Sequence, residues 1–285
     1  MRIPPFTAFL ALLSALALPA SLRAAEAPKP LKALLVLGGC CHDYTRQMDI
    51  LKSGLEARAH IVVEASFNPD RSTRAKYAAY EKPDWAKGFD VIIHDECSSD
   101  VKDVEYVNNI LAAHKAGIPA VNLHCAMHSY RVGSFRDPVT PGSPDALWFD
   151  LLGLQSTGHG PQEPIELKSV AKDHPIMKGW SDWTTVKEEL YNNIKIFDSA
   201  TPLLRGRQVL KQKDGTTKDA ESVVAWVNHY GKTRVFSTTV GHNNETVADA
   251  RYLDLVTRGL LWSCDKLNDT YLKPQPKPDA QKDSK

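Results

Sequence analysis

The sequence lacks the signals that identify the commonest charged and nucleotide ligands. Its 285 residues carry a formal net charge of only +1, so no overall field draws nucleic acid or an anionic membrane to it. Neither a G-x-G-x-x-G nor a Walker pattern is present, which argues against a nucleotide cofactor. C-x-x-C pairs and the H-E-x-x-H motif are also absent, so a structural zinc module is not expected. A small or neutral molecule is the expected partner.

The N-terminus has no apolar run long enough for a membrane-spanning helix, which needs about twenty residues. A shorter apolar stretch covers residues 6–18 after Arg2, and small residues follow at 24–27. This pattern is typical of a secretory signal peptide, which we assign to residues 1–24. The protein is therefore expected to be exported, to be periplasmic or extracellular after cleavage, and to have no stable membrane insertion.

Cysteine is scarce and poorly placed for cross-linking. Five cysteines in an exported chain leave at least one unpaired. Cys40 and Cys41 are adjacent, and we expect this arrangement to disfavour a bond between them. With 42% hydrophobic residues, the chain can form a core large enough to fold without a disulfide scaffold.

Apolar runs alternate with helical periodicity through the first half of the chain. The runs predict strands at residues 31–37, 60–63, 89–94 and 118–123, with helices around 48–55 and 104–111 between them. Nearly continuous apolar runs indicate strands that are covered on both faces. Repeated strand, helix, strand units predict an α/β fold with a doubly wound, mainly parallel sheet flanked by helices. Residues 223–227 and 234–239 predict an added β-hairpin with its turn at Gly231.

This regularity weakens in the middle of the chain and at its end. Residues 132–144 are rich in Pro and Gly, and a polar stretch surrounds residues 158–160, so we expect loops there. The sequence shows no internal repeat. We expect one domain over residues 31–268 and a disordered tail over residues 269–285.

Polar side chains follow the predicted strands at their carboxyl ends, where open parallel sheets bind ligands. The groups delivered there are His42 and Asp43 after the first strand, His94 and Glu96 with the third, and His124 and His128 after the fourth. Because the ends of parallel strands meet at one edge of a sheet, we expect these groups to converge.

The end of the fourth strand resembles a nucleophile elbow, a sharp turn that needs small residues beside its exposed side chain. With His124 at the apex, the residue two positions later is Ala126, which fits. With Cys125 at the apex, that residue is Met127, which fits badly. We therefore favour His124 at the apex and keep Cys125 as the alternative.

A transition-metal centre needs three or four converging ligands. Candidate imidazoles are present, although no tight spacing joins them, at His42, His124, His128, His159 and His242. We expect no cofactor and keep a divalent metal on these histidines as the alternative. His114 is expected to be a solvated or packed surface residue.

These residues lie in segments that resemble the ThuA-like (trehalose utilisation) family over about residues 31–265. The matching segments, in the family's order, include Gly38-Gly39-x-x-His42-Asp43-Tyr44, Ala116-Gly117-x-x-x-Val121-x-x-His124-x-Ala126-x-His128-Ser129, Glu188-Glu189-Leu190-Tyr191, and Ala225-Trp226 through to Gly241-His242. The sequence departs from the family at Cys40-Cys41, where small or polar residues are usual, and at Lys232-Thr233, where a glycine is usual.

The resemblance implies a flavodoxin-like, class I glutamine-amidotransferase-like fold without the usual cysteine nucleophile, and a role in carbohydrate metabolism. The implied substrate is a small sugar, either a trehalose-like disaccharide or its 3-keto derivative. A keto group acidifies the adjacent C–H bond, so a lyase, hydrolase or isomerase could work by general acid/base chemistry.

We expect His124 or His42 to act as the base or acid and Asp43 to orient an imidazole. The expected substrate-binding residues are His128, His159, Glu189, Tyr191 and His242. Two alternatives stay open: an amidase or hydrolase that uses Cys125 as its nucleophile, and a sugar-binding module without catalysis.

Overall fold

The computed structural model describes Met1 and residues 27–275. Apart from Met1, the expected signal peptide lies outside the described residues, as do residues 276–285 of the expected tail. The first part of that tail packs against the domain, because Leu272 forms a β-bridge with Ala59 and the Lys273 amide donates to the Arg58 carbonyl at 2.8 Å. Within residues 27–275, no helix is long and apolar enough to cross a membrane.

One sheet organises the described residues, with nine strands in the order β2-β1-β3-β4-β9-β8-β7-β5-β6. The strands are β1 (Leu31–Gly39), β2 (Ile61–Asn68), β3 (Val91–Cys97), β4 (Ala120–Leu123), β5 (Leu154–Ser169), β6 (Trp183–Ile196), β7 (Thr201–Lys211), β8 (Thr217–Tyr230) and β9 (Thr233–Thr238). The pairings from β2 through β9 are parallel, and those from β9 through β6 are antiparallel. The expectation of a mainly parallel sheet is therefore wrong, and the fold is α/β with a mixed sheet.

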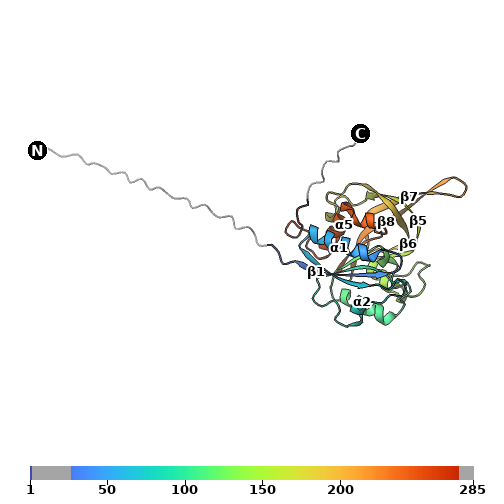
Figure 1. Ribbon diagram of the computed structural model, residues 1–285, viewed down its shortest axis with the longest axis horizontal. Coiled ribbons are helices and arrows are strands. Elements are labelled where there is room, and N and C mark those ends of the chain that lie inside the picture. The colour runs from blue at the N-terminus through green and yellow to red at the C-terminus, as the bar shows by residue number, and fades with distance from the viewer. Residues whose placement is uncertain (2–26, 276–285) are drawn as a thin grey trace.

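Helices cover both faces of the sheet (Figure 1). One face packs against α1 (Tyr44–Arg58), α4 (Asn244–Ala248) and α5 (Ala250–Ser263), and the other against α2 (Val104–Lys115) and α3 (Leu147–Leu152). Short 3₁₀ helices are η1 (Ala78–Glu81), η2 (His124–His128), η3 (Pro144–Ala146) and η4 (Pro175–Met177). Successive residues of β1 alternate between the two cores, since Leu35 joins the α1/α5 core and Val36 the α2/α3 core. This burial on both faces explains why the run is continuously apolar.

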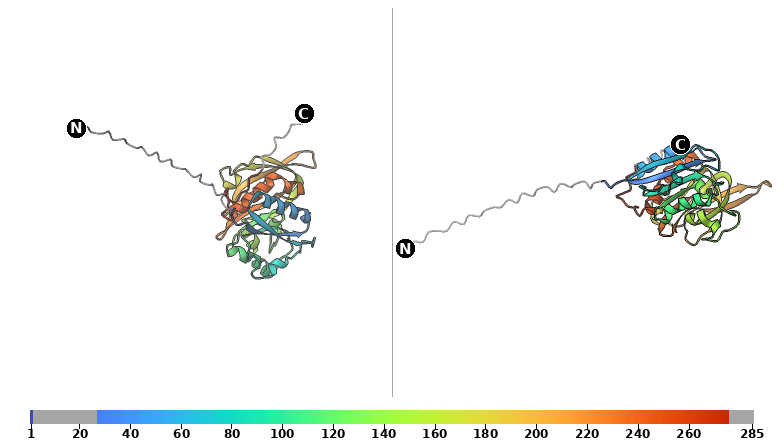
Figure 2. Two further views of the ribbon diagram at one scale, coloured as in Figure 1. Left: turned by 60° about the vertical axis from the view of Figure 1, so that its left-hand side comes forward. Right: turned by 90° about the horizontal axis from the view of Figure 1, so that it is seen from below.

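The antiparallel half was only partly predicted. The hairpin of β8 and β9 is confirmed, with Gly231 at φ 61° in its turn. The polar stretch at residues 158–160, expected to be a loop, lies inside β5 instead. β5 is buried at its start and again at Ile165 and Leu167, but residues 157–164 between them are exposed or half-buried, so it lacks a continuous apolar run. It also has several register shifts against β6. The β7–β8 hairpin extends beyond the body of the molecule (Figure 2).

Candidate active site

Three histidines converge at the carboxyl ends of parallel strands. His42 follows β1, His124 follows β4 and His242 follows β9. One ring nitrogen of each lies within 4.8 Å of the corresponding nitrogens of the other two, and we call these three residues the histidine cluster. The expected convergence at one sheet edge therefore occurs for His42 and His124, and His242 joins them there.

The backbone at the end of β1 explains how His42 reaches the cluster. Gly38 and Gly39 have φ values of 131° and 91°, which L side chains rarely adopt. A Cβ atom on Gly39 would lie 2.2 Å from the Cys97 carbonyl oxygen of β3. The two glycines thus allow the backbone of β1 to lie close to its neighbours and to turn toward the site.

His124 occupies the turn after β4 with a positive φ of 37°, as expected for the apex of an elbow. Its side chain is almost fully buried. Its Nδ1 lies 2.6 Å from the Thr239 carbonyl oxygen, which can only accept, so the hydrogen sits on Nδ1. In the neutral ring, Nε2 therefore keeps a lone pair, which faces the Tyr191 hydroxyl at 3.3 Å.

Glu189 of β6 brings a buried carboxylate to the cluster. Its Oε2 lies 3.5 Å from His124 Nε2 and 3.5 Å from His159 Nε2. Its Oε1 lies 3.3 Å from Nδ1 of His242. One carboxylate thus faces three imidazoles that come from different parts of the chain.

The remaining predicted binding residues form one side of this site. The His128 and Tyr191 rings stack with centroids 4.1 Å apart and planes 5° apart. His128 is buried and its Nε2 lies 2.9 Å from the Ser156 hydroxyl, so it supports the Tyr191 ring from behind. The side chain of His159 is 42% exposed, which leaves it on the solvent side of Glu189.

The surroundings shift the pKa values of His42, His242 and Glu189 in different directions. Burial, with added repulsion from His124 and His242, lowers the pKa of His42 to about 2. Burial alone would lower the pKa of His242, but its interaction with Glu189 outweighs burial and raises that pKa. Burial would raise the pKa of Glu189, yet its contacts with His124 and His242 hold that pKa well below its ordinary value.

Asp43 lies beside the site without contacting an imidazole in the way expected. It caps α1, with Oδ1 accepting from the Arg46 amide at 3.2 Å, and Oδ2 accepts from Asn244 Nδ2 at 3.0 Å. Both oxygens are therefore engaged elsewhere. The groups that orient the imidazoles are Thr239 and Glu189 instead.

His94 and Glu96 of β3 are not part of the cluster, although we expected them there. Both are fully buried, and His94 Nδ1 lies 3.0 Å from Glu96 Oε1. The hydroxyls of Tyr80 and Tyr130 each donate to the same oxygen at 3.0 Å. Because alternate strand residues point to opposite faces, this network belongs to the α2 side of the sheet.

His114 completes that network and corrects its predicted surface position. It is fully buried in α2, with Nδ1 2.7 Å from the Ile118 carbonyl oxygen and Nε2 3.0 Å from His94 Nε2. The carbonyl takes the hydrogen of Nδ1, so Nε2 of His114 accepts from His94. Burial, followed by repulsion from His94, lowers the pKa of His114 to about 3.

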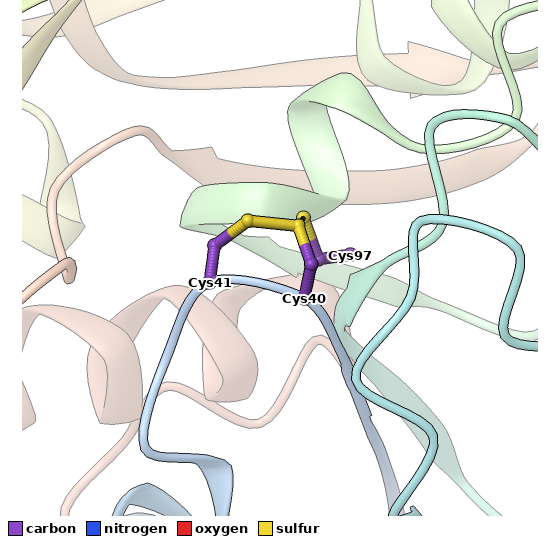
Figure 3. Close-up of side chains that lie close together, drawn as sticks. All are labelled: Cys40, Cys41 and Cys97. Carbon is purple, nitrogen blue, oxygen red and sulfur yellow. Dashed lines mark hydrogen bonds between the residues drawn. A yellow bond between two sulfur atoms is a disulfide. The ribbon is translucent and has the colours of Figure 1, made fainter.

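The cysteines are arranged differently from the prediction. Cys40 and Cys41 form a disulfide, as Figure 3 shows, with Cα atoms 3.7 Å apart. The positive φ of Cys41, 86°, belongs to the tight turn in which these neighbouring side chains meet. Cys97 is free, and its Sγ lies 3.5 Å from that of Cys40 and 2.8 Å from that of Cys125.

Three residues that the sequence analysis missed hold the cluster in place. Gln162 Nε2 lies 2.7 Å from His242 Nε2 and 3.2 Å from Glu189 Oε1. The Glu188 carboxylate accepts from the His242 amide at 2.9 Å, and Gln47 donates to the His242 carbonyl at 3.1 Å. Gln47 lies in α1 and Gln162 in β5, so no local pattern connects either with a histidine about 80 or more positions away. Of the three, only Glu188 had a signal in the sequence, because it directly precedes Glu189 in a segment that resembles the family.

The fold and the site define an α/β protein with a mixed sheet and a histidine–carboxylate site at the ends of its parallel strands. The trehalose utilisation (ThuA) family matches residues 34–263, and the chain belongs to this family. Family membership supports a carbohydrate-related function. No curated protein matches the chain.

Solved structures of similar proteins show the same fold. A ThuA-like protein from Parabacteroides merdae has 19% identity and a TM-score of 0.62, over 83% of this chain and 90% of its own. A ThuA-like protein from Bacteroides uniformis has 15% identity and a TM-score of 0.57, over 87% of this chain and 95% of its own. A cytoplasmic protein from Salmonella typhimurium has 13% identity and a TM-score of 0.52, over 85% of this chain and all of its own.

Proposed function

We propose that the protein is an enzyme that acts on trehalose-like disaccharides or their 3-keto derivatives by proton transfer at the histidine cluster and Glu189. The observation that carries this proposal is the buried Glu189 carboxylate, which lies within 3.5 Å of ring nitrogens of three histidines. Proton removal beside a keto group needs a positioned base and a nearby acid, and this arrangement offers both.

His124 is the proposed base. The hydrogen on its Nδ1 is held by the Thr239 carbonyl, so in the neutral ring Nε2 carries the lone pair that takes a proton from carbon. The Tyr191 hydroxyl, 3.3 Å away, can donate to an oxygen of the sugar once the sugar displaces this contact. His42 is the second candidate, because its Nδ1 has no hydrogen-bond partner in the described residues and its ring lies beside that of His124.

The other residues bind the sugar in this proposal. Glu189 and His242 accept and donate hydrogen bonds to hydroxyl groups, and the half-exposed His159 contacts the part of the disaccharide nearer to solvent. The proposed substrate is a neutral polyol, which agrees with the formal net charge of +1 for the chain.

Sugar consumption tests this proposal directly. The wild-type protein is incubated with trehalose and with 3-keto-trehalose, beside the variants His124→Ala and His229→Ala. His229 lies on β8 and is exposed, so its variant controls for the loss of an imidazole. We expect the keto sugar to be consumed and the rate to fall by about a hundredfold or more in His124→Ala alone. Calorimetric binding without consumption would favour the binding module instead.

We further propose that the chain is exported with residues 1–24 as its signal peptide. The Cys40–Cys41 disulfide supports this proposal, since disulfides persist mainly in oxidising compartments. N-terminal sequencing of the protein from a periplasmic fraction is expected to start near residue 25. A full-length chain confined to the cytoplasm would contradict it.

A further inference from the structure

In each imidazole of the histidine cluster, one nitrogen contacts a neighbouring polar group of the protein. The other nitrogen lies on the opposite side of the ring from that group. His124 uses Nδ1 for the Thr239 carbonyl, at 2.6 Å. His42 places Nε2 3.0 Å from Cys125 Sγ, and His242 places Nε2 2.7 Å from the Gln162 amide. Histidines that bind metals show this division, because a hydrogen bond to one nitrogen fixes the ring for coordination through the other.

The free nitrogens are buried. Nδ1 of His42 is inaccessible to solvent and has no hydrogen-bond partner in the part of the chain that the structure describes. Nδ1 of His242 is also inaccessible to solvent, and the nearest polar group is the Glu189 carboxylate, whose Oε1 lies 3.3 Å away. Most buried polar atoms in proteins are paired, so the unpaired nitrogen of His42 in this cluster requires an explanation. A bound cation would accept its lone pair.

The spacing of the cluster fits a transition metal. The three ring centroids are separated by 4.8, 4.6 and 5.5 Å, with interplanar angles between 71° and 84°, so the rings converge edge-on and do not stack. Metal–nitrogen distances of about 2.1 Å place tetrahedral ligands roughly 3.4 Å from one another. One ring nitrogen of each histidine already lies within 4.8 Å of those of the other two, so side-chain movements of about 1 Å would close the site.

We propose that His42, His124 and His242 bind a divalent first-row transition metal, with Zn²⁺ as the reference ion. Imidazole nitrogen suits Zn²⁺ and its neighbours, whereas Mg²⁺ and Ca²⁺ prefer oxygen ligands. The buried Glu189 carboxylate supplies negative charge next to the three neutral ligands, and the fourth position stays open for an oxygen of the substrate.

Coordination through His242 requires one local change. Gln162 Nε2 donates to His242 Nε2, which places a hydrogen on Nδ1 beside Glu189. When the Gln162 amide turns over, its oxygen accepts from Nε2 and the lone pair moves to Nδ1. The turn keeps the shape of the side chain but gives up the 3.2 Å hydrogen bond from Gln162 Nε2 to Glu189 Oε1, and the charge of the nearby cation offsets that loss.

The Cys40, Cys41 and Cys97 group is the competing set of ligands, since its sulfur atoms also lie within 4.8 Å of one another. Two of these sulfurs are joined in a disulfide and cannot act as thiolates. Among the described residues, the histidine cluster is therefore the better site.

Metal binding does not depend on the substrate proposed above. A metal at this position would polarise a keto or hydroxyl oxygen of a sugar. His124 would then be a ligand, and proton removal would fall to Glu189. Turnover by acid/base chemistry at the histidines alone should therefore survive metal removal, whereas turnover that uses the metal should not.

The test is metal binding by the full mature protein. Protein dialysed against a chelator is titrated with Zn²⁺ by calorimetry and with Co²⁺ by absorption spectroscopy, with Mg²⁺ as the negative control. We expect one tight Zn²⁺ equivalent and a visible Co²⁺ spectrum without a sulfur charge-transfer band. His124→Ala and His242→Ala should abolish tight binding, whereas His229→Ala should retain it. Gln162→Ala should weaken binding by about 10–100-fold.

The outcomes separate the two proposals. No stoichiometric uptake of Zn²⁺ or Co²⁺ by the wild type, or equal affinity in folded His242→Ala, overturns the metal site. If the His124→Ala variant does not fold, because His124 is buried, the Co²⁺ spectrum of the wild type still shows whether the metal site exists. Keto-sugar turnover that survives chelation would leave the acid/base proposal standing alone, whereas metal uptake without turnover would leave only the metal site.

Discussion

Cys125 lies where a thiol nucleophile would be expected, in the turn after β4 and 3.0 Å from Nε2 of His42. Its surroundings nevertheless oppose that role. Its Sγ donates to Cys97 at 2.8 Å and the residue is buried. The hydrogen bond to Cys97, followed by burial, raises the pKa of the thiol well above its usual range. A position near a histidine is not sufficient for a reactive cysteine.

We predict that Cys125 is inert to iodoacetamide in the folded protein, because its sulfur is buried and paired with Cys97. The measurement is mass-spectrometric mapping of alkylated peptides over time. Protein unfolded in guanidinium is the control, in which Cys97, Cys125 and Cys264 should all be modified. Rapid modification of native Cys125 together with loss of activity would instead favour the hydrolase alternative.

His114 makes the stability of the fold depend on pH. It faces His94 of β3, and Glu96 lies beyond that imidazole. The pKa of His114 is about 3 in the folded protein and about 6.5 in the unfolded chain. Between these values only the unfolded chain binds the proton, so the free energy of unfolding must fall as the pH falls.

We predict a loss of roughly 5 kcal/mol at most from this one group between pH 6.5 and pH 3, since each pKa unit is worth about 1.4 kcal/mol. Urea unfolding at a series of pH values measures it. His114→Asn, which can still donate to the Ile118 carbonyl, should flatten the dependence in this window. An unchanged slope in that variant would assign the acid sensitivity to other groups.

At the scale of secondary-structure elements, the end of β1 depends on glycine for two separable reasons. Gly39 and Gly88 share a φ of 91°, but only Gly39 is crowded, with the Cys97 carbonyl 2.2 Å from the position of a Cβ. A Cβ on Gly88 would meet nothing within 4 Å. The two positions therefore separate backbone strain from steric overlap.

We predict that Gly88→Ala costs about 1–2 kcal/mol of unfolding free energy, which is the strain of a left-handed residue. Gly39→Ala should cost clearly more, because β1 must move away from β3 as well. It should also weaken the site, since His42 lies three positions further on. Urea denaturation of both variants measures the difference, and equal losses would show that the close contact relaxes freely.

The two halves of the sheet differ in how much the sequence reveals. β1, β3 and β4 are buried on both faces, so their apolar runs identify them without structural information. β5 carries exposed polar residues and shifts its register against β6, so in the sequence part of it resembles a loop. Prediction therefore succeeded where burial was two-sided and failed for most of the antiparallel half.

The site follows the same division. His42 and His124 could be placed because they follow recognisable strands, and the ends of parallel strands meet. Glu189 came from the family resemblance alone, and Gln162 lies in the strand that was not predicted. Asp43 was given the wrong partner, because a helix N-cap and an imidazole-orienting carboxylate look alike in sequence.

At the scale of the whole molecule, two apolar cores hold the fold together, one on each face of the sheet. The single disulfide in the described residues joins neighbours in the sequence. A disulfide stabilises a protein chiefly by closing a loop in the unfolded chain, and the gain grows with the length of that loop. A bond between adjacent residues closes the shortest loop possible.

We therefore predict that reduction of Cys40–Cys41 lowers the Tm by no more than about 3 °C, which for a domain of this size corresponds to about 1 kcal/mol. Thermal unfolding with and without a phosphine reductant, on chelator-dialysed protein, measures the shift. The double variant Cys40→Ala, Cys41→Ala should match the reduced wild type. A much larger fall would mean that this bond holds the turn between β1 and α1 in place, and that the two cores depend on it.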